Sequence, residues 1–133
     1  MHIIITEPTD FPADARAQLN GIGRVTVGPF TRNELTNALP EADVLIVRLG
    51  HLIDKEIMAV ATKLKYIVTA TTGLNHIDMV SAENQGIRVL SLRGETEFLK
   101  TISPTAELTM GLILSLVRHI PAAVAAVNTG AWN

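Results

Sequence analysis

The sequence predicts an α/β fold built on a parallel sheet of five strands, and three observations lead to that prediction. Five short apolar runs, rich in β-branched residues, alternate with segments of helical spacing. The runs are continuously apolar, as expected of strands that are covered on both faces. Each return to the same edge of a parallel sheet needs a crossover, and right-handed crossovers give a doubly wound, flavodoxin-like arrangement.

The predicted elements follow one another from the second residue to residue 90. Strands are expected at residues 2–6, 24–27, 43–48, 65–69 and 87–90, and helices at residues 11–19, 31–39, 54–61 and 78–84. Asn20-Gly21 and Gly28-Pro29 supply turn signals. Thr31 with Glu34 three residues later has the spacing of a capping box, which opens the second helix.

The pattern changes after the fifth strand. Residues 93–102 are polar and predicted to be irregular, and Ser103 with Pro104 predicts the N-cap and first position of a long apolar helix. This helix is expected to run to about Val127, interrupted by Pro121. We therefore expect a flavodoxin-like domain at residues 1–102 and a helical segment at residues 103–133. Such an apolar helix needs cover from the sheet, a second copy or a further domain.

Composition excludes several classes of protein. The chain has 133 residues, 47% of them hydrophobic and 18% charged, with a net charge of −2 and no cysteine. These values argue against a disordered chain, a nucleic-acid-binding protein, a disulfide scaffold and a thiolate metal site. No signal peptide or membrane-spanning run is evident, so we expect a soluble, cytoplasmic protein.

Three common kinds of functional site are excluded by the order and spacing of the residues they require. Gly21 and Gly23 could begin a dinucleotide fingerprint, but they lie after a helix and before a strand, the reverse of the required order. The histidines show no metal-ligand spacing, so no metal site is expected. A phosphoryl-accepting receiver would need an acid at the end of the third strand, where Arg48 stands.

The ends of the predicted strands do suggest an anion site. Arg48 follows the third strand, and Thr72, Gly73 and Leu74 follow the fourth. A guanidinium binds a carboxylate through two parallel hydrogen bonds, and glycine lets backbone N–H groups approach a ligand closely. The alternative is a surface ion pair for Arg48 and a plain turn at Gly73.

Seven short motifs, taken in order, resemble one family. They are Val47-Arg48, Lys63-Leu64-Lys65, Thr72-Gly73-Leu74-Asn75-His76-Ile77-Asp78, Gly86-Ile87-Arg88-Val89, Thr105-Ala106-Glu107-Leu108-Thr109, Arg118-His119-Ile120-Pro121 and Gly130-Ala131-Trp132. The chain resembles the N-terminal, substrate-binding part of the D-isomer-specific 2-hydroxyacid dehydrogenases and is similar in pattern to phosphoglycerate dehydrogenases. The resemblance is weak before Asp43 and strong after it.

The resemblance implies part of a two-domain, NAD-dependent oxidoreductase acting on a 2-hydroxy or 2-oxo acid. It implies that Arg48 faces the cleft, that the backbone amides of Thr72, Gly73 and Leu74 hold the substrate carboxylate, and that Thr72 also contacts the cofactor. Glu107 matches a glutamate at the domain junction. The family's catalytic arginine, glutamate and histidine lie in or after an NAD-binding domain that this sequence lacks. We therefore expect no catalytic residue here, an inactive chain without tight NAD binding, and a homodimer formed through the C-terminal helix.

Two departures from the family pattern leave questions open. Asn75-His76 replaces the usual Asp-Asn pair, a change expected to be neutral because both residues would lie at a helix N-terminus. The stretch at residues 92–103 is longer than in the phosphoglycerate dehydrogenase pattern, which leaves the substrate undetermined. NAD cannot be distinguished from NADP, nor a natural from an engineered truncation. The alternative function is a free-standing, non-catalytic flavodoxin-like module for binding or dimerisation.

Overall fold

The computed structural model describes residues 1–131. Trp132, part of the last motif quoted above, lies outside the described residues. The chain forms two compact units, one spanning Met1–Gly94 and the other beginning at Glu95. The sequence places this boundary later, at residues 102 and 103.

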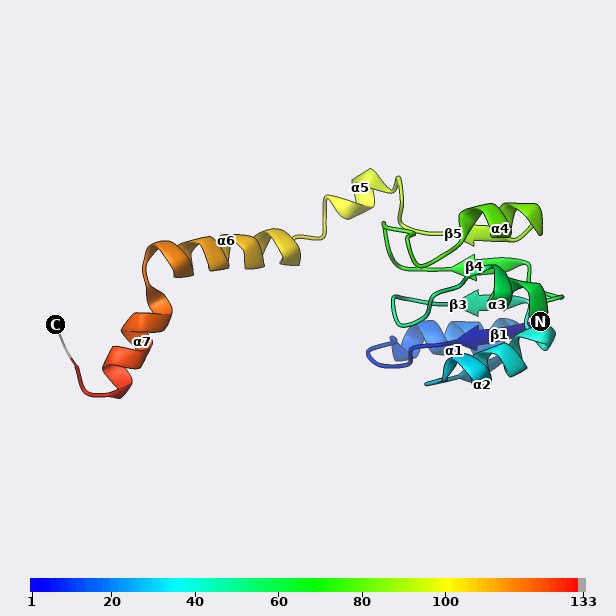
Figure 1. Cartoon of the computed structure of the whole chain (residues 1–133), viewed down its shortest axis with the longest axis horizontal. Coiled ribbons are helices and arrows are strands. Elements are labelled where there is room, and N and C mark those ends of the chain that lie inside the picture. Colours follow the sequence, from blue (N-terminus) through cyan, green and yellow to red (C-terminus); the bar gives the residue numbers. More distant parts are fainter. Residues whose placement is uncertain (132–133) are drawn as a thin grey trace. The chain divides into compact units, whose positions relative to one another are not determined.

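The first unit contains five parallel strands in the order β2-β1-β3-β4-β5. Figure 1 labels β1, β3, β4 and β5 in this order. The strands are β1 (His2–Ile5), β2 (Arg24–Val27), β3 (Val44–Ile46), β4 (Tyr66–Val68) and β5 (Arg88–Leu90). This order is that of flavodoxin-like sheets and confirms the predicted fold. The order reverses direction at β1, so the carboxyl end of β1 lies beside that of β3.

Four helices connect these strands: α1 (Ala13–Ile22), α2 (Arg32–Ala38), α3 (Lys55–Val60) and α4 (Met79–Asn84). The predicted capping box is confirmed, because Thr31 accepts the Glu34 N–H and the Glu34 carboxylate accepts the Thr31 N–H. Asp54 and Asp78 cap α3 and α4 through their side-chain carboxylates. A short 3-10 helix, η1 (Leu39–Glu41), follows α2 and was not expected from the sequence.

One face of the sheet carries the main core. Side chains from α2, η1, α3 and α4 pack there against alternate strand residues such as Ile4, Leu45 and Ile67, all fully buried. On the opposite face Ile3 and Ile5 are buried, whereas the alternate residues of β3 and β4 are only half-buried and Leu90 on β5 is 51% exposed. The expectation of strands covered equally on both faces therefore holds for β1 but not for β5.

The second unit contains α5 (Thr96–Leu99), α6 (Pro104–Val117) and α7 (Ile120–Asn128). The sequence predicts an interruption of the long helix at Pro121, and the structure has one slightly earlier, between Val117 and Ile120. The chain breaks at His119, whose φ of 51° is left-handed, and Pro121 lies in the first turn of α7. Ser103 and Pro104 occupy the N-cap and the first position of α6, as predicted, but the Ser103 hydroxyl donates to the Glu107 carboxylate instead of accepting a backbone N–H. No residue of α6 or α7 is buried.

Within residues 1–131 no single helix is long and apolar enough to cross a membrane. The pair formed by Thr96–Val117 and Ile120–Asn128, bent by 63°, would be sufficient by length and composition alone.

Candidate functional site

Three loops meet at the edge of the sheet where the parallel strands end. They follow β1, β3 and β4 and comprise residues 6–12, 47–54 and 69–78. Ligands of doubly wound sheets bind outside the carboxyl ends of the strands, close to the point where the strand order reverses. This edge is therefore the first place to look for a site.

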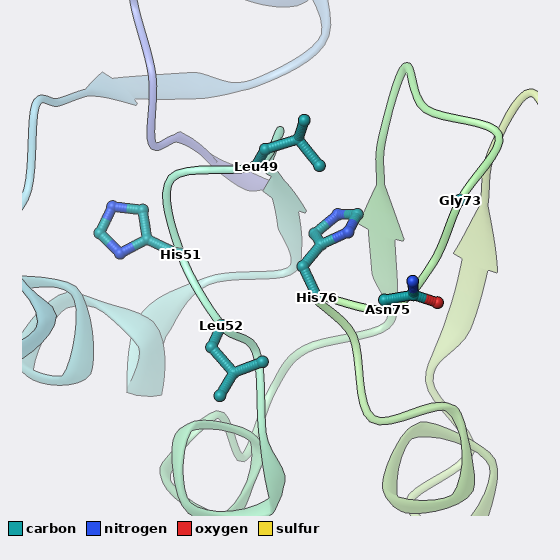
Figure 2. A pocket seen from close by; sticks show the side chains of 6 residues that line it. All are labelled: Leu49, His51, Leu52, Gly73, Asn75 and His76. Carbon is teal, nitrogen blue, oxygen red and sulfur yellow. The ribbon is translucent and has the colours of Figure 1, made fainter.

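A pocket with a volume of about 370 Å³ lies between the loops after β3 and β4 (Figure 2). Its lining residues are Leu49, His51, Leu52, Gly73, Asn75 and His76. Leu49 and Leu52 are 71% and 56% exposed, which gives the pocket an apolar rim. None of these lining residues carries a permanent charge, and the volume is within the range of small-molecule sites, roughly 300–1,000 Å³.

The two walls of this pocket are joined by backbone hydrogen bonds. The Ile53 N–H donates to the His76 carbonyl at 2.8 Å, and the Asp78 N–H donates to the Ile53 carbonyl at 2.9 Å. These bonds pair Ile53 with Ile77 in parallel, and both side chains are buried in the core. The relative position of the two walls is therefore fixed by the core.

A series of polar contacts supports the loop after β4. The Thr69 hydroxyl lies 3.5 Å from Nε2 of the buried His76 and 3.0 Å from the Thr71 hydroxyl, which donates to the Gly73 carbonyl at 2.8 Å. Asn75 and His76 do not lie at the helix N-terminus expected from the sequence, since Asp78 caps α4. Both residues line the pocket.

Of the predicted carboxylate-binding residues, Gly73 lies on the pocket wall. The backbone N–H groups of Thr72, Gly73 and Leu74 donate no hydrogen bond to any residue in the described range 1–131. A Cβ placed on Gly73 would meet no atom within 4 Å, so the backbone here is open to a ligand. The Leu74 side chain packs against the core, and Thr72 is exposed.

Arg48 takes a different direction from the one expected. Its Nη1 donates to the Thr9 carbonyl at 3.2 Å, and its side chain lines a second pocket, of about 310 Å³, beside Asp10, Phe11 and Ala70. The guanidinium and the loop at Gly73 therefore do not line the same pocket. The substrate contact implied for Arg48 remains a prediction.

Glu7 is the residue of this edge that sequence reasoning missed. Its carboxylate accepts hydrogen bonds from the N–H groups of Arg48 at 2.6 Å, Gly50 at 2.8 Å and Leu49 at 3.2 Å. Burial alone would raise the pKa of Glu7, but these bonds and one from the Thr6 hydroxyl outweigh it and lower the pKa below 4.5. The available signal was an acidic residue at the end of a strand that neighbours β3.

The other expected sites are easily placed. Gly21 lies in α1 and Gly23 follows it directly before β2, which confirms the order that excludes a dinucleotide fingerprint. Within residues 1–131 no group of three or more histidine and acidic side chains could hold a metal ion. His51 and His76 line the first pocket, and Glu107 is held by Ser103 in the first turn of α6.

Comparison with known proteins gives the family. Residues 3–109 match the D-isomer specific 2-hydroxyacid dehydrogenase, catalytic domain. A D-3-phosphoglycerate dehydrogenase of Methanocaldococcus jannaschii is 36% identical over 98% of this chain and 24% of its own length. A hydroxypyruvate reductase of Thermotoga maritima is 36% identical over 82% of this chain and 34% of its own length.

The solved structures agree with the sequence comparisons. The structure of the TT0316 protein from Thermus thermophilus has a TM-score of 0.82 and 30% identity, covering 100% of this chain and 42% of that one. This chain thus spans between 24% and 42% of the length of these relatives. The match extends across the sheet, the two loops of the pocket and the start of α6, so the chain belongs to the D-isomer-specific 2-hydroxyacid dehydrogenase family.

Proposed function

We propose that this chain is the substrate-binding part of an NAD-dependent oxidoreductase acting on the CH–OH group of a D-2-hydroxy acid, similar to phosphoglycerate dehydrogenase. The observation that carries the proposal is the open loop at Gly73. There the N–H groups of residues 72–74 have no partner within residues 1–131, at the wall of a pocket of about 370 Å³. Several convergent N–H donors form a suitable site for a carboxylate.

In this proposal the chain binds and orients the acid. Hydrogen bonds from backbone N–H groups to a carboxylate are charge-assisted and about twice as strong as neutral ones. The apolar rim at Leu49 and Leu52 borders the acid in this proposal. Holding C2 in one orientation contributes to rate because it removes the entropy cost of alignment.

NAD, when bound, supplies the hydride acceptor for the C2 carbon of the hydroxy acid. Thr72 is exposed on the open loop, a position that suits contact with the nicotinamide end of the cofactor. The phosphate groups of a dinucleotide are bound by a glycine-rich turn that leads from a strand into a helix, and residues 1–131 contain no such turn. We therefore propose that the chain by itself neither binds NAD tightly nor turns over.

Arg48 is proposed as a second contact for the substrate. Its guanidinium is exposed and makes one hydrogen bond within the described part of the chain, to the Thr9 carbonyl. That single bond leaves the remaining N–H donors of the fork available to an anion. To reach the loop at Gly73 the side chain would have to leave Thr9.

The second unit is proposed to form a homodimer interface. Its helices expose Leu112, Leu116 and Val124 by 62%, 77% and 53%, and contiguous apolar surface of this kind marks an interaction site. Glu107 in the first turn of α6 is proposed to lie at the junction with an NAD-binding domain. A cytoplasmic location completes the proposal.

Titration of the chain with hydroxypyruvate and with 3-phosphoglycerate tests the proposal. We expect amide NMR signals of residues 72–76 to shift. A Gly73→Ala variant should bind more weakly, by about tenfold, because the added Cβ hinders the close approach of the carboxylate to the N–H groups. Gly21→Ala is the matched control, because a Cβ meets no atom within 4 Å at either glycine. Absence of any shift at residues 72–76 with both acids contradicts the proposal.

The exposed helices also favour a second function, a non-catalytic module for binding or dimerisation. The two are distinguished by the gene sequence after Asn133. A glycine-rich fingerprint there supports the dehydrogenase, and a stop codon supports the module.

A further inference from the structure

The carboxylate of Glu7 occupies a cluster of backbone donors that no other side chain reaches within residues 1–131. Three successive N–H groups, those of Arg48, Leu49 and Gly50, point toward its two oxygens. Consecutive N–H groups at a turn form a concave site that favours an anion. Here the anion comes from the protein itself, across a separation of 41 residues in the sequence.

The fit leaves little room for another arrangement. Oε2 is 2.6 Å from the Arg48 nitrogen, and Oε1 is shared between Leu49 and Gly50 at 3.2 and 2.8 Å. A Cβ on Gly50 would lie 2.9 Å from Oε1, which is closer than real Cβ atoms approach. Glycine at position 50 therefore admits the carboxylate, and both oxygens are needed to satisfy the donors.

The turn held by Glu7 is the same turn that builds one wall of the pocket. Leu49 lies within it, and His51 and Leu52 follow immediately, all three lining the pocket. At its far end the turn is fixed by Ile53, which pairs with Ile77. Glu7 therefore fixes the near end of a wall whose far end is fixed by the core.

We propose that Glu7 is a positioning residue for substrate binding: its carboxylate holds residues 48–50 so that Leu49, His51 and Leu52 line the pocket opposite the loop at Gly73. Glu7 does not touch the acid. This role rests on the proposed function, because it assigns to Glu7 the shape of the pocket in which the 2-oxo acid binds.

Two substitutions separate the chemistry of Glu7 from its size. Glu7→Gln keeps the length of the side chain but replaces one acceptor oxygen with an NH₂ group that faces an N–H donor. Glu7→Asp keeps both oxygens and the charge but shortens the reach by one methylene. Glu34→Gln is the matched control, since the Glu34 carboxylate also accepts a backbone N–H, from Thr31 at 2.7 Å, on a helix that does not line the pocket.

Two measurements are made on the intact chain: amide hydrogen exchange at residues 48–50, and the Kd for hydroxypyruvate. In Glu7→Gln we expect exchange at residues 48–50 to accelerate by roughly tenfold to a hundredfold, the worth of one hydrogen bond to a charged group. We expect the Kd to rise by at least about fivefold, with Glu7→Asp intermediate, while the amide signals of β4 and β5 show that the sheet stays folded. Glu34→Gln should change exchange at Thr31 but leave the Kd unchanged.

Each other outcome overturns a defined part of the reasoning. Unchanged exchange at residues 48–50 in Glu7→Gln refutes the positioning role, whether or not the acid binds. Faster exchange with an unchanged Kd would show that Glu7 stabilises the turn without affecting binding, and this outcome also refutes the positioning role. If the wild-type chain binds no acid while exchange accelerates as expected, the proposed function fails, and with it the role of Glu7 in binding.

Discussion

Replacing Ile53 with alanine tests the claim that the core fixes the walls of the pocket. Ile53 is 0% exposed, belongs to the main core and pairs through its backbone with Ile77. Alanine leaves the backbone bonds in place and removes the rest of the buried side chain. Ile→Ala at a fully buried site costs about 2–5 kcal/mol, whereas Ile→Val costs about 0.5–1.5 kcal/mol. Against a total stability of about 5–15 kcal/mol for a domain, the first change is large.

Urea unfolding followed through the amide NMR signals of β3 and β4 reports on the first unit without a contribution from α6 and α7. We expect Ile53→Ala to lower the free energy of unfolding by about 2–5 kcal/mol and Ile53→Val by about 1 kcal/mol. Ile22→Ala is the control, because that side chain is 60% exposed and should lose less than about 0.5 kcal/mol. A loss below about 1 kcal/mol for Ile53→Ala would show that this loop is not anchored in the core.

Three further outcomes follow from the structure. Leu116→Glu, at a side chain 77% exposed, should convert the proposed dimer to a monomer in light scattering, and an unchanged mass would exclude α6 as the interface. The pKa of Asp54 is lowered from its ordinary value, chiefly by the hydrogen bond from the Ile57 N–H and further by Arg32, although desolvation opposes the shift. The stabilisation that the Asp54 carboxylate contributes is therefore present above its unfolded-state pKa and is lost as the pH falls through the folded-state pKa. Asp54→Asn should therefore reduce the loss of stability between neutral and acidic urea titrations, and an equal loss in both proteins would contradict this. Thr31→Ala, which removes the cap of α2, should cost about 1 kcal/mol in the same urea experiment, and no change would mean that the cap contributes nothing.

The fold was predictable because its signals are local. Each strand is a short apolar run, and the capping box at Thr31 is visible in four residues of sequence. Because parallel strands need crossovers, the alternation of strands and helices then restricts the topology to a few arrangements. The predicted strands are longer than most of those observed. Apolar residues continue beyond the ends of the observed strands, as the buried Val47 does after β3, where its N–H still donates to the Val68 carbonyl.

The break between α6 and α7 was not predictable in its position. Proline is tolerated in the first turn of a helix, so Pro121 is compatible with a helix that starts at Ile120 as well as with an interruption at Pro121 itself. The residue that turns the chain is His119, with φ of 51°. Histidine is enriched in that conformation, but non-glycine residues adopt it so rarely that the presence of His119 does not predict a break.

The site shows the same division between local and long-range information. Gly73 and its open N–H groups come from a contiguous loop, and the sequence identified that loop. Arg48 and Glu7 depend instead on the strand order, which brings the carboxyl end of β1 beside that of β3. The Arg48 guanidinium then donates to the Thr9 carbonyl in the loop after β1. The Glu7 carboxylate accepts hydrogen bonds from three N–H groups in the loop after β3. A sequence motif specifies neither of these partners. A glutamate after the first strand therefore acquires a role only once β3 lies next to β1, and the same adjacency gives Arg48 a partner on the side away from Gly73.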